Sequence, residues 1–265
     1  MKRLSILFAC AALLAAAAGC SSDHTNRSGV GGVRVMMTDA PMDIDAVNLV
    51  VRGVSVHRSG TDEITGWETI DAETDSATFD LMTLRNGVFV TLGVANVPTG
   101  HYDQVRLLLG SGSTVVVDGV THPLEVPSGA TSGIKLHGEF DVTENHTVEI
   151  GLDFDAARSI HETGNGRWMM NPVIRFFVIA GSGRIMGALS PADVPTTIFA
   201  IANGETLQTA SAGVSGGTFT LAGLSAGTYQ VAFDPDSGWR DTTLTNVSVG
   251  TGATVDVGTV TLTHE

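Results

Sequence analysis

Short runs in which apolar and polar residues alternate fill most of this chain, and they constrain its fold more than any other feature. Alternation of this kind places every second side chain on one face of a β-strand. It is clear at Val33–Val35, Val47–Val51 and Val54–Val56. The dipeptide Asp118-Gly119 separates two further runs and is typical of a tight hairpin turn. The pattern predicts an all-β protein.

Helical periodicity is scarce, and it predicts only two short helical segments, Phe79–Leu84 and Asp155–Ile160, the first ended by Asn86-Gly87. Strands are expected between and around them. Those of the first part, besides the runs above, are Trp67–Ile70, Val88–Leu92, Gln104–Leu109, Thr114–Val117, Lys135–Val142, Thr147–Phe154 and Val173–Ile179.

Gly181-Ser182-Gly183 interrupts this pattern directly after an apolar run and predicts a domain boundary. Seven short strands at regular spacing follow it, which is typical of a β-sandwich. We therefore expect two β-sandwich-like domains in tandem, residues 33–180 and 181–265. The seven strands expected in the second are Ile185–Leu189, Thr197–Ala202, Thr218–Leu221, Thr228–Phe233, Leu244–Val249, Thr254–Val257 and Val260–Leu262.

The first twenty residues have the organisation of a bacterial export signal. Lys2 and Arg3 precede an apolar run, and Ala17-Ala18-Gly19-Cys20 forms a small-residue site that ends in cysteine. The stretch resembles a lipoprotein signal, which implies that residues 1–19 are removed, that Cys20 carries lipid and that residues 20–32 form a flexible tether. An ordinary cleaved signal and a retained anchor are the alternatives. The retained anchor fits less well, because a membrane-spanning helix needs about 20 apolar residues.

Composition narrows the classes of partner. The chain has only two cysteines, Cys10 and Cys20, so a mature chain lipidated at Cys20 would have no disulfide and no thiol chemistry. Its net charge of −14 includes the positive residues of the signal and opposes binding to nucleic acid. Hydrophobic residues make up 43% of the sequence, which is more than a disordered chain would contain.

Several short phrases occur in an order that resembles the DUF4382 family of bacterial and archaeal lipoproteins, over about residues 32–180. The resemblance implies a β fold and an envelope location, and it brings no established activity. The phrases are Thr38-Asp39-Ala40-Pro41, Asp80-Leu81-Met82-Thr83-Leu84-Arg85-Asn86-Gly87, Pro98-Thr99-Gly100-His101-Tyr102, Pro123–Gly129, Ser132–Leu136, Leu152-Asp153-Phe154-Asp155 and Asn171-Pro172-Val173-Ile174-Arg175.

The second domain is similar to the carboxypeptidase regulatory-like, or prealbumin-like, module. The resemblance rests on Gly183–Gly187 and on the stretch Gly217–Tyr229, in which a glycine turn joins two strands. Such modules are spacers and interaction domains, so the resemblance implies no catalysis.

Asp153 and Asp155 are the foremost candidate site residues. They lie two apart in an expected strand and therefore share a face, about 7 Å apart. With Asp39 or backbone carbonyls they could hold Ca²⁺, which is the only cofactor that the sequence suggests. The simpler interpretation is that they cap the turn at residues 156–160 or face water, and that the protein has no cofactor. A catalytic carboxylate pair is the remotest interpretation.

Two further residues are weighed as functional. Trp239 follows a turn and could provide an exposed platform for a glycan, although a structural role at a domain edge is the simpler expectation. Ser215 lies in a Gly-x-Ser-x-Gly pattern, but a β-rich segment follows it where a hydrolase would need a helix.

The sequence thus predicts a non-catalytic lipoprotein that is anchored to a membrane of the cell envelope by lipid. Ser21 is compatible with the outer membrane. The expected partners are the membrane itself and a protein or glycan at the cell surface, with no nucleic acid. The alternatives are a calcium-dependent carbohydrate-binding or adhesion module and, more remotely, a hydrolase.

Overall fold

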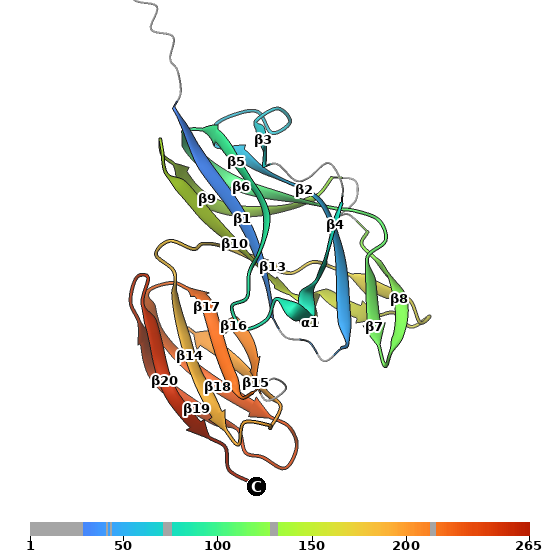
Figure 1. Ribbon diagram of the computed structural model, residues 1–265, viewed down its shortest axis with the longest axis vertical. Helices are drawn as coiled ribbons and strands as arrows, with labels where there is room; N and C mark the ends of the chain where they lie inside the picture. The colour runs from blue at the N-terminus through green and yellow to red at the C-terminus, as the bar shows by residue number, and fades with distance from the viewer. Residues whose placement is uncertain (1–28, 41, 43, 71–75, 128–131, 213–215) are drawn as a thin grey trace, which may run out of the picture.

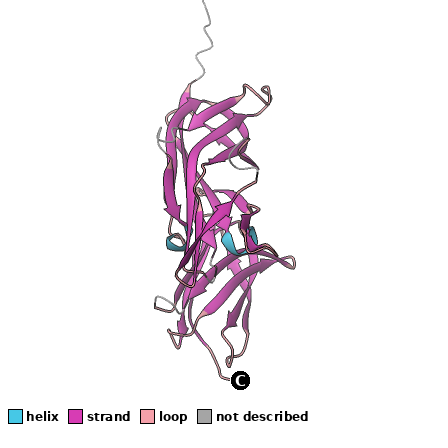
Figure 2. Ribbon diagram, turned by 90° about the vertical axis from the view of Figure 1, so that its right-hand side faces the viewer, coloured by secondary structure: helices cyan, strands magenta, loops and turns pink. Residues whose placement is uncertain are grey.

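The described part of the chain forms an elongated molecule that is built almost entirely of strands (Figures 1 and 2). The computed structural model describes residues 29–40, 42, 44–70, 76–127, 132–212 and 216–265. The first strand begins at one end of the long axis and the C-terminus lies at the other (Figure 1). The all-β prediction and the tandem arrangement of β-sandwich-like domains are confirmed.

The first domain contains thirteen strands and two short helices within the described residues. They are β1 (Val30–Ala40), β2 (Ala46–Arg58), β3 (Trp67–Ile70), β4 (Ala77–Asp80), η1 (Leu81–Thr83, a 3-10 helix), β5 (Val90–Pro98), β6 (Gly100–Leu109), β7 (Thr114–Val117), β8 (Val120–Glu125), β9 (Ile134–Val142), β10 (Thr147–Asp155), α1 (Ala156–Ser159), β11 (Ile160–Glu162), β12 (Trp168–Met170) and β13 (Ile174–Val178).

Two sheets enclose the core of this domain. One has the strand order β13-β10-β1-β5, and the other has the order β11-β12-β8-β7-β2-β6-β9, with β3 and β4 also paired to β2. In the first sheet β1 and β10 run parallel, and the register pairs Val35 with Ile150 and Met37 with Leu152. These four side chains are fully buried. The alternation read from the sequence therefore defines the inner face of the sheet.

The strand β2 is longer than the sequence pattern suggests. The expected strands Val47–Val51 and Val54–Val56 are one continuous element, and the register of β2 against β6 shifts between Val51 and Gly53. The first part of β2 pairs with β4 and β7, and the later part pairs with β3 and β6.

The second domain contains seven strands in two sheets. They are β14 (Gly183–Ser190), β15 (Thr196–Ala202), β16 (Glu205–Ala212), β17 (Thr218–Leu224), β18 (Gly227–Pro235), β19 (Thr242–Val249) and β20 (Thr254–Thr261). The sheet orders are β17-β14-β20 and β16-β15-β18-β19. Its first strand pairs in parallel with its last, much as β1 pairs in parallel with β10.

The strand number matches the prediction, but two of the strands were predicted wrongly. The two strands expected at 254–257 and 260–262 are one strand, β20, which ends at Thr261. Gly258 within it has φ +71° at an irregularity of the register against β14. The strand β16 was not predicted. It pairs with β15 through a turn at Asn203-Gly204, where both residues have positive φ.

The only two tyrosines of the chain occupy equivalent corners of the two domains. The Tyr102 hydroxyl donates to the carbonyl oxygen of Pro98 at 2.7 Å, and the Tyr229 hydroxyl donates to that of Ser225 at 2.7 Å. Each bond spans four residues and fixes the turn that leads into a central strand. Burial raises the pKa of Tyr102 to about 12 and raises the pKa of Tyr229 as well.

The smaller local predictions are largely confirmed. Asp118 and Gly119 have positive φ and connect β7 to β8 as a hairpin. The two expected helices are present but shorter than predicted, as η1 and α1 (Figure 2). Leu84 rather than Asn86-Gly87 caps η1, and both residues of that pair instead form a turn with positive φ.

Candidate functional site at the junction of the two domains

A groove of about 910 Å³ lies where the two domains meet. The first domain lines it from the ends of β1 and β10, from α1 and from β13, and the second lines it from β15 and β16. Its walls offer carboxylates, guanidiniums, hydroxyls and an amide together with apolar surface. The lining residues are Ala40, Met42, Asp153, Asp155, Ala157, Arg158, Val173, Arg175, Thr197, Phe199, Glu205, Thr206, Leu207, Gln208 and Thr209.

Asp153 is the buried carboxylate of this groove. The register of β10 against β13 places it beside Arg175, and its Oδ2 accepts from Nε and Nη2 of that residue at 3.4 Å. Its Oδ1 is buried and has no hydrogen-bond partner among the described residues. Burial raises the pKa of Asp153 to about 6, against the opposing effect of the Arg175 charge.

Arg175 extends from this carboxylate into the second domain. Its Nη1 donates to the carbonyl oxygen of Gly223 at 2.7 Å, and its Nη2 donates to that of Ala222 at 3.2 Å. Nη2 also donates to the Gln208 side-chain oxygen at 3.2 Å. One guanidinium therefore bonds to both domains, and it does so through a planar fork that lysine could not reproduce.

Aromatic packing supports the same junction. The Arg175 guanidinium carbon lies 4.9 Å from the centre of the Phe177 ring, which is buried and contacts Phe89 edge to face. Gly223 has φ +69°, and a Cβ built on it would lie 2.7 Å from the Phe177 ring. Only glycine both accepts this backbone conformation and leaves room for the ring.

The Asn86-Gly87 turn contacts the second domain nearby. Asn86 Oδ1 accepts from the amide of Ser211 at 3.3 Å, and a Cβ at Gly87 would lie 3.1 Å from Thr220. The turn that the sequence suggested as a helix cap therefore has a second role, as part of the contact between domains.

Asp155 has the role that the simpler interpretation gave it. It precedes α1, and its Oδ1 accepts from the amide of Arg158 at 2.9 Å, which is an N-cap bond. Its Oδ2 lies 3.8 Å from the exposed Arg158 guanidinium.

Asp39 lies on the other face of the sheet from Asp153. The register pairs Asp39 with Phe154 and Thr38 with Asp153, so alternation places Asp39 on the core side. Its Oδ1 accepts from the amide of Ala156 at 3.2 Å, and its Oδ2 has no partner among the described residues. Burial raises the pKa of Asp39 well above its ordinary value.

Calcium binding by Asp39, Asp153 and Asp155 stays a prediction. Within the described ranges, no group of three or more His, Cys, Asp or Glu side chains is arranged to hold a metal ion.

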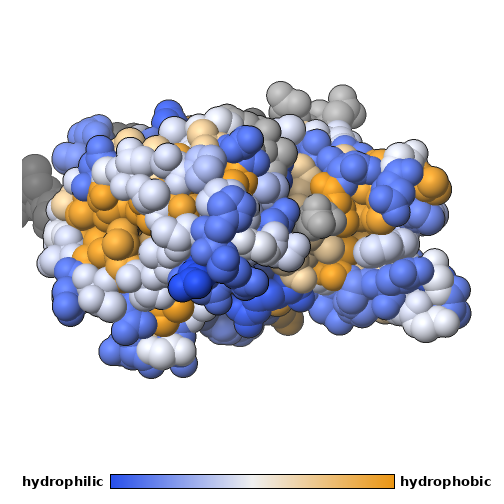
Figure 3. Space-filling model, turned by 90° about the horizontal axis from the view of Figure 1, so that it is seen from below, coloured by the Kyte–Doolittle hydropathy of each residue, from blue (hydrophilic) through white to orange (hydrophobic). Residues whose placement is uncertain are grey.

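Trp239 packs partly against the core of the second domain, and the His264 ring stacks on it with the ring centres 3.8 Å apart. It lies near the C-terminus, because residues 239 and 264 form a β-bridge. A view from this end of the molecule shows apolar side chains in separate patches among hydrophilic ones (Figure 3).

The predicted lipidation site Cys20 lies outside the described residues, as does Ser215, whose glycine-rich pattern the sequence context argued against. Where the chain is described, no helix has the length and hydropathy to cross a bilayer.

Sequence reasoning missed Arg175 and Gln208. The signal for Arg175 was a charged residue inside the apolar run 173–180, where a buried strand would not tolerate an unpaired charge. Gln208 gave no comparable signal, because the strand that holds it was not predicted.

Comparison with known proteins identifies the first domain. The sequence pattern of the family described as "Domain of unknown function (DUF4382)" matches residues 30–172, which is more than half of the chain. No curated protein matches the chain in sequence.

Solved structures resemble the chain only remotely. The Bacillus anthracis TIE protein is 10% identical over 89% of this chain, with a TM-score of 0.23, and a leucine-rich repeat protein from Bacteroides thetaiotaomicron is 14% identical over 88%, with a TM-score of 0.22. This chain covers 34% and 26% of those two proteins. GBS52, the minor pilin of Streptococcus agalactiae, is 12% identical over 88% of this chain and 96% of its own, with a TM-score of 0.22. Likeness at this level carries no inference about this chain.

Proposed function

The chain belongs to the DUF4382 family, and we propose that it is an exported lipoprotein whose two β domains form a rigid, non-catalytic structural or binding module of the cell envelope. Lipid on Cys20 would anchor it to a membrane, with the outer membrane as the expected location.

The observation that carries the proposal is the junction at Arg175. It bonds to Asp153 on one side and to the Ala222 and Gly223 carbonyl oxygens on the other, so one side chain links the two domains. Domains of one chain move relative to each other unless their interface is well packed. A rigid junction suits a protein that holds its far end at a fixed position.

The arrangement of the termini supports the same function. β1 begins at one end of the long axis (Figure 1), and eight residues separate Cys20 from Gly29. Such a tether reaches at most about 30 Å when extended. The first domain would then lie close to the membrane, and the second would project away from it.

We also propose that the second domain is a carboxypeptidase regulatory-like module that serves as a spacer or interaction domain. Its partner would be a protein or a glycan at the cell surface. The tip near Trp239 and His264 would lie farthest from the anchor and is the part most accessible to such a partner.

Two measurements test the anchoring and the rigidity separately. Mass spectrometry of the native protein should find an N-terminal, lipid-modified Cys20, and an intact Met1 would contradict the anchoring. Nitrogen-15 relaxation should give both domains one correlation time. Arg175→Met should give two, whereas Arg240→Met, which removes an exposed arginine, should not. Independent domain motion in the unaltered chain would contradict the proposal.

The calcium-dependent alternative has its own test. Calorimetric titration with CaCl₂ should give no saturable heat if the module is metal-independent. A saturable heat that Asp155→Asn abolishes would instead support a calcium site at the groove.

A further inference from the structure

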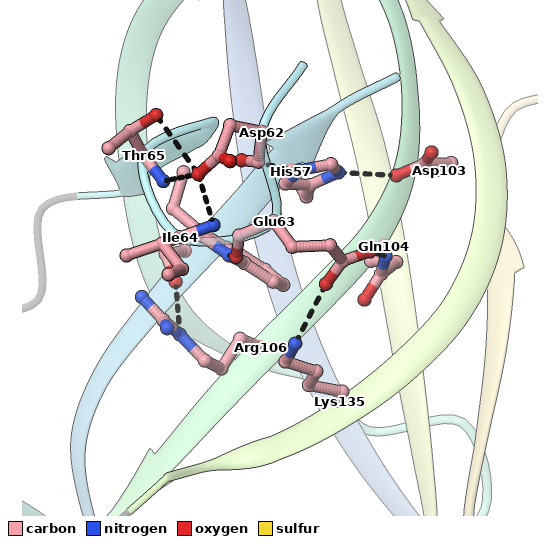
Figure 4. Close-up of polar contacts among 11 residues, drawn as sticks. His57, Asp62, Glu63, Ile64, Thr65, Asp103, Gln104, Arg106 and Lys135 are labelled. Carbon is pink, nitrogen blue, oxygen red and sulfur yellow. Dashed lines mark hydrogen bonds and ion pairs between the residues drawn. The ribbon is translucent and has the colours of Figure 1, made fainter. Parts of the chain in front are cut away.

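The segment 59–66, which joins β2 to β3, folds back over the outer face of the larger sheet of the first domain (Figure 4). Asp62 Oδ1 accepts from the amides of Ile64 at 2.9 Å and Thr65 at 3.1 Å, which closes a turn. The Glu63 carboxylate accepts from the Gln104 side chain at 3.1 Å. His57 and Gln104 are buried although both lie on the outer face of the sheet. Segment 59–66 therefore covers the side chains of His57 and Gln104, and the hydrogen bonds of Asp62 and Glu63 hold it in place.

Next to segment 59–66, the Arg106 side chain is held by an aromatic ring and a hydroxyl group. Its guanidinium carbon lies 4.3 Å from the centre of the Trp67 ring. Its Nε donates to the hydroxyl of buried Ser55 at 3.1 Å. Gly133 leaves room for the aliphatic part, since a Cβ there would lie 2.8 Å from Arg106 Cγ. Trp67 is fixed in turn, because its indole N–H donates to the carbonyl oxygen of Glu63 at 2.8 Å.

The two terminal nitrogens of Arg106 have no hydrogen bond or ion pair among the described residues. Some arginines of the described residues do contact carboxylates, as Arg34 contacts Glu149 at 2.7 Å. Arg106 is ordered by a hydroxyl and an aromatic ring, and no carboxylate of the described residues bonds to its guanidinium.

A second cation stands next to it. The register of β6 against β9 pairs Arg106 directly with Lys135, and like charges in that position destabilise a sheet. Lys135 Nζ contacts Glu63 at 3.0 Å and lies 5.4 Å from the Trp67 ring centre. Glu63 thus compensates Lys135, whereas Arg106 has no ion pair with any described carboxylate.

We propose that Arg106, positioned on Trp67, binds an oxyanion, either the carboxylate of an acidic sugar or a phosphate group. A guanidinium offers two parallel N–H groups that match two oxygens of either anion, and stacking on an aromatic ring removes most of the cost of ordering it. Lys135 adds attraction from the neighbouring strand. The net charge of −14 repels anions at long range, so the affinity for a small anion should be modest and should fall with salt.

The test is a titration of the full chain, labelled with nitrogen-15 in neutral detergent, with glucuronate in one arm and inorganic phosphate in the other. The Nε–H signal of Arg106 and the indole N–H signal of Trp67 should shift together and saturate. The arm that saturates at the lower concentration identifies the anion. Arg106→Lys keeps the positive charge but loses the two parallel N–H groups of the guanidinium. It should weaken anion binding at least tenfold, as measured from the indole N–H signal of Trp67.

Arg240→Gln is the matched control, because it removes one exposed positive charge elsewhere and should leave the affinity unchanged. A circular dichroism spectrum like that of the unaltered chain would show that Arg106→Lys is folded. Shifts that rise linearly in both arms, or an equal affinity in Arg106→Lys, would overturn the proposal.

Discussion

Asp153→Asn is expected to make the protein more stable at neutral pH, although it removes half of an ion pair. The reason is the burial of Asp153, whose folded pKa of about 6 exceeds the ordinary value of 3.8. A carboxyl of this kind holds its proton more tightly in the folded chain than in the unfolded one. The stability that the proton provides is complete below about pH 4 and is lost as the pH rises through 6.

The magnitude follows from the two pKa values. Each tenfold change in the ionisation constant is worth about 1.4 kcal/mol, so the loss amounts to about 3 kcal/mol by pH 8. Asparagine keeps the shape of the side chain, still offers Arg175 an oxygen and cannot ionise. The other titrating groups are common to both chains. The charge of Asp153 helps to raise the pKa of Asp39, so the difference between the chains reports Asp153 together with this coupling.

The assay is urea unfolding of both chains at intervals from pH 4 to pH 8. The free energy of unfolding of Asp153→Asn minus that of the unaltered chain should grow by about 3 kcal/mol over this range, which corresponds to about 6–12 °C in melting temperature. Burial would not be the dominant effect if the difference were constant with pH. If the difference fell as the pH rose, attraction to Arg175 would outweigh desolvation.

Four further substitutions test the glycine backbone positions and the tyrosine hydrogen bonds. Gly223→Ala should cost about 2–4 kcal/mol in urea unfolding, because it adds contact with Phe177 to left-handed strain, whereas Gly204→Ala, with φ +82° and no atom within 4 Å of its Cβ, should cost only about 1 kcal/mol. Equal costs would mean that the ring contact is unimportant. Tyr102→Phe and Tyr229→Phe should each lower stability by about 1–2 kcal/mol through the loss of one buried hydrogen bond, and no change in the unfolding midpoint of either would contradict a structural role for that corner.

The fold could be predicted from the sequence wherever inward-facing residues were large and apolar. The strand β16 was not predicted because its buried positions are Gln208, Ala210 and Ala212, and these residue types have little preference for strands. Asn203-Gly204 was the available signal, since this dipeptide favours the hairpin turn that the structure contains. The division of β20 had the opposite cause, because Gly258 resembles a turn but is a bulge inside one strand.

The site could be predicted only in its local parts. Asp155 caps the helix that immediately follows it, and the spacing of those residues contains this information. The contact of Asp153 with Arg175 depends on the pairing of β10 with β13, and the contact of Arg175 with Gly223 depends on how two domains meet. Neither contact produces a periodic pattern in the sequence. The only indication of this site was therefore Arg175, a charged residue within the apolar run 173–180.

The acceptors at the junction also determine how it should respond to acid. Arg175 reaches the second domain through the backbone carbonyls of Ala222 and Gly223 and the amide of Gln208, and none of these groups titrates. Protonation of Asp153 below pH 6 therefore weakens its attraction to Arg175 but leaves the bonds of Arg175 to the carbonyl oxygens of Ala222 and Gly223. We expect the domains to keep one common correlation time at pH 5 and at pH 8. Separate correlation times at pH 5 alone would mean that the charge of Asp153 is needed to hold Arg175 in place, and that the neutral acceptors are insufficient.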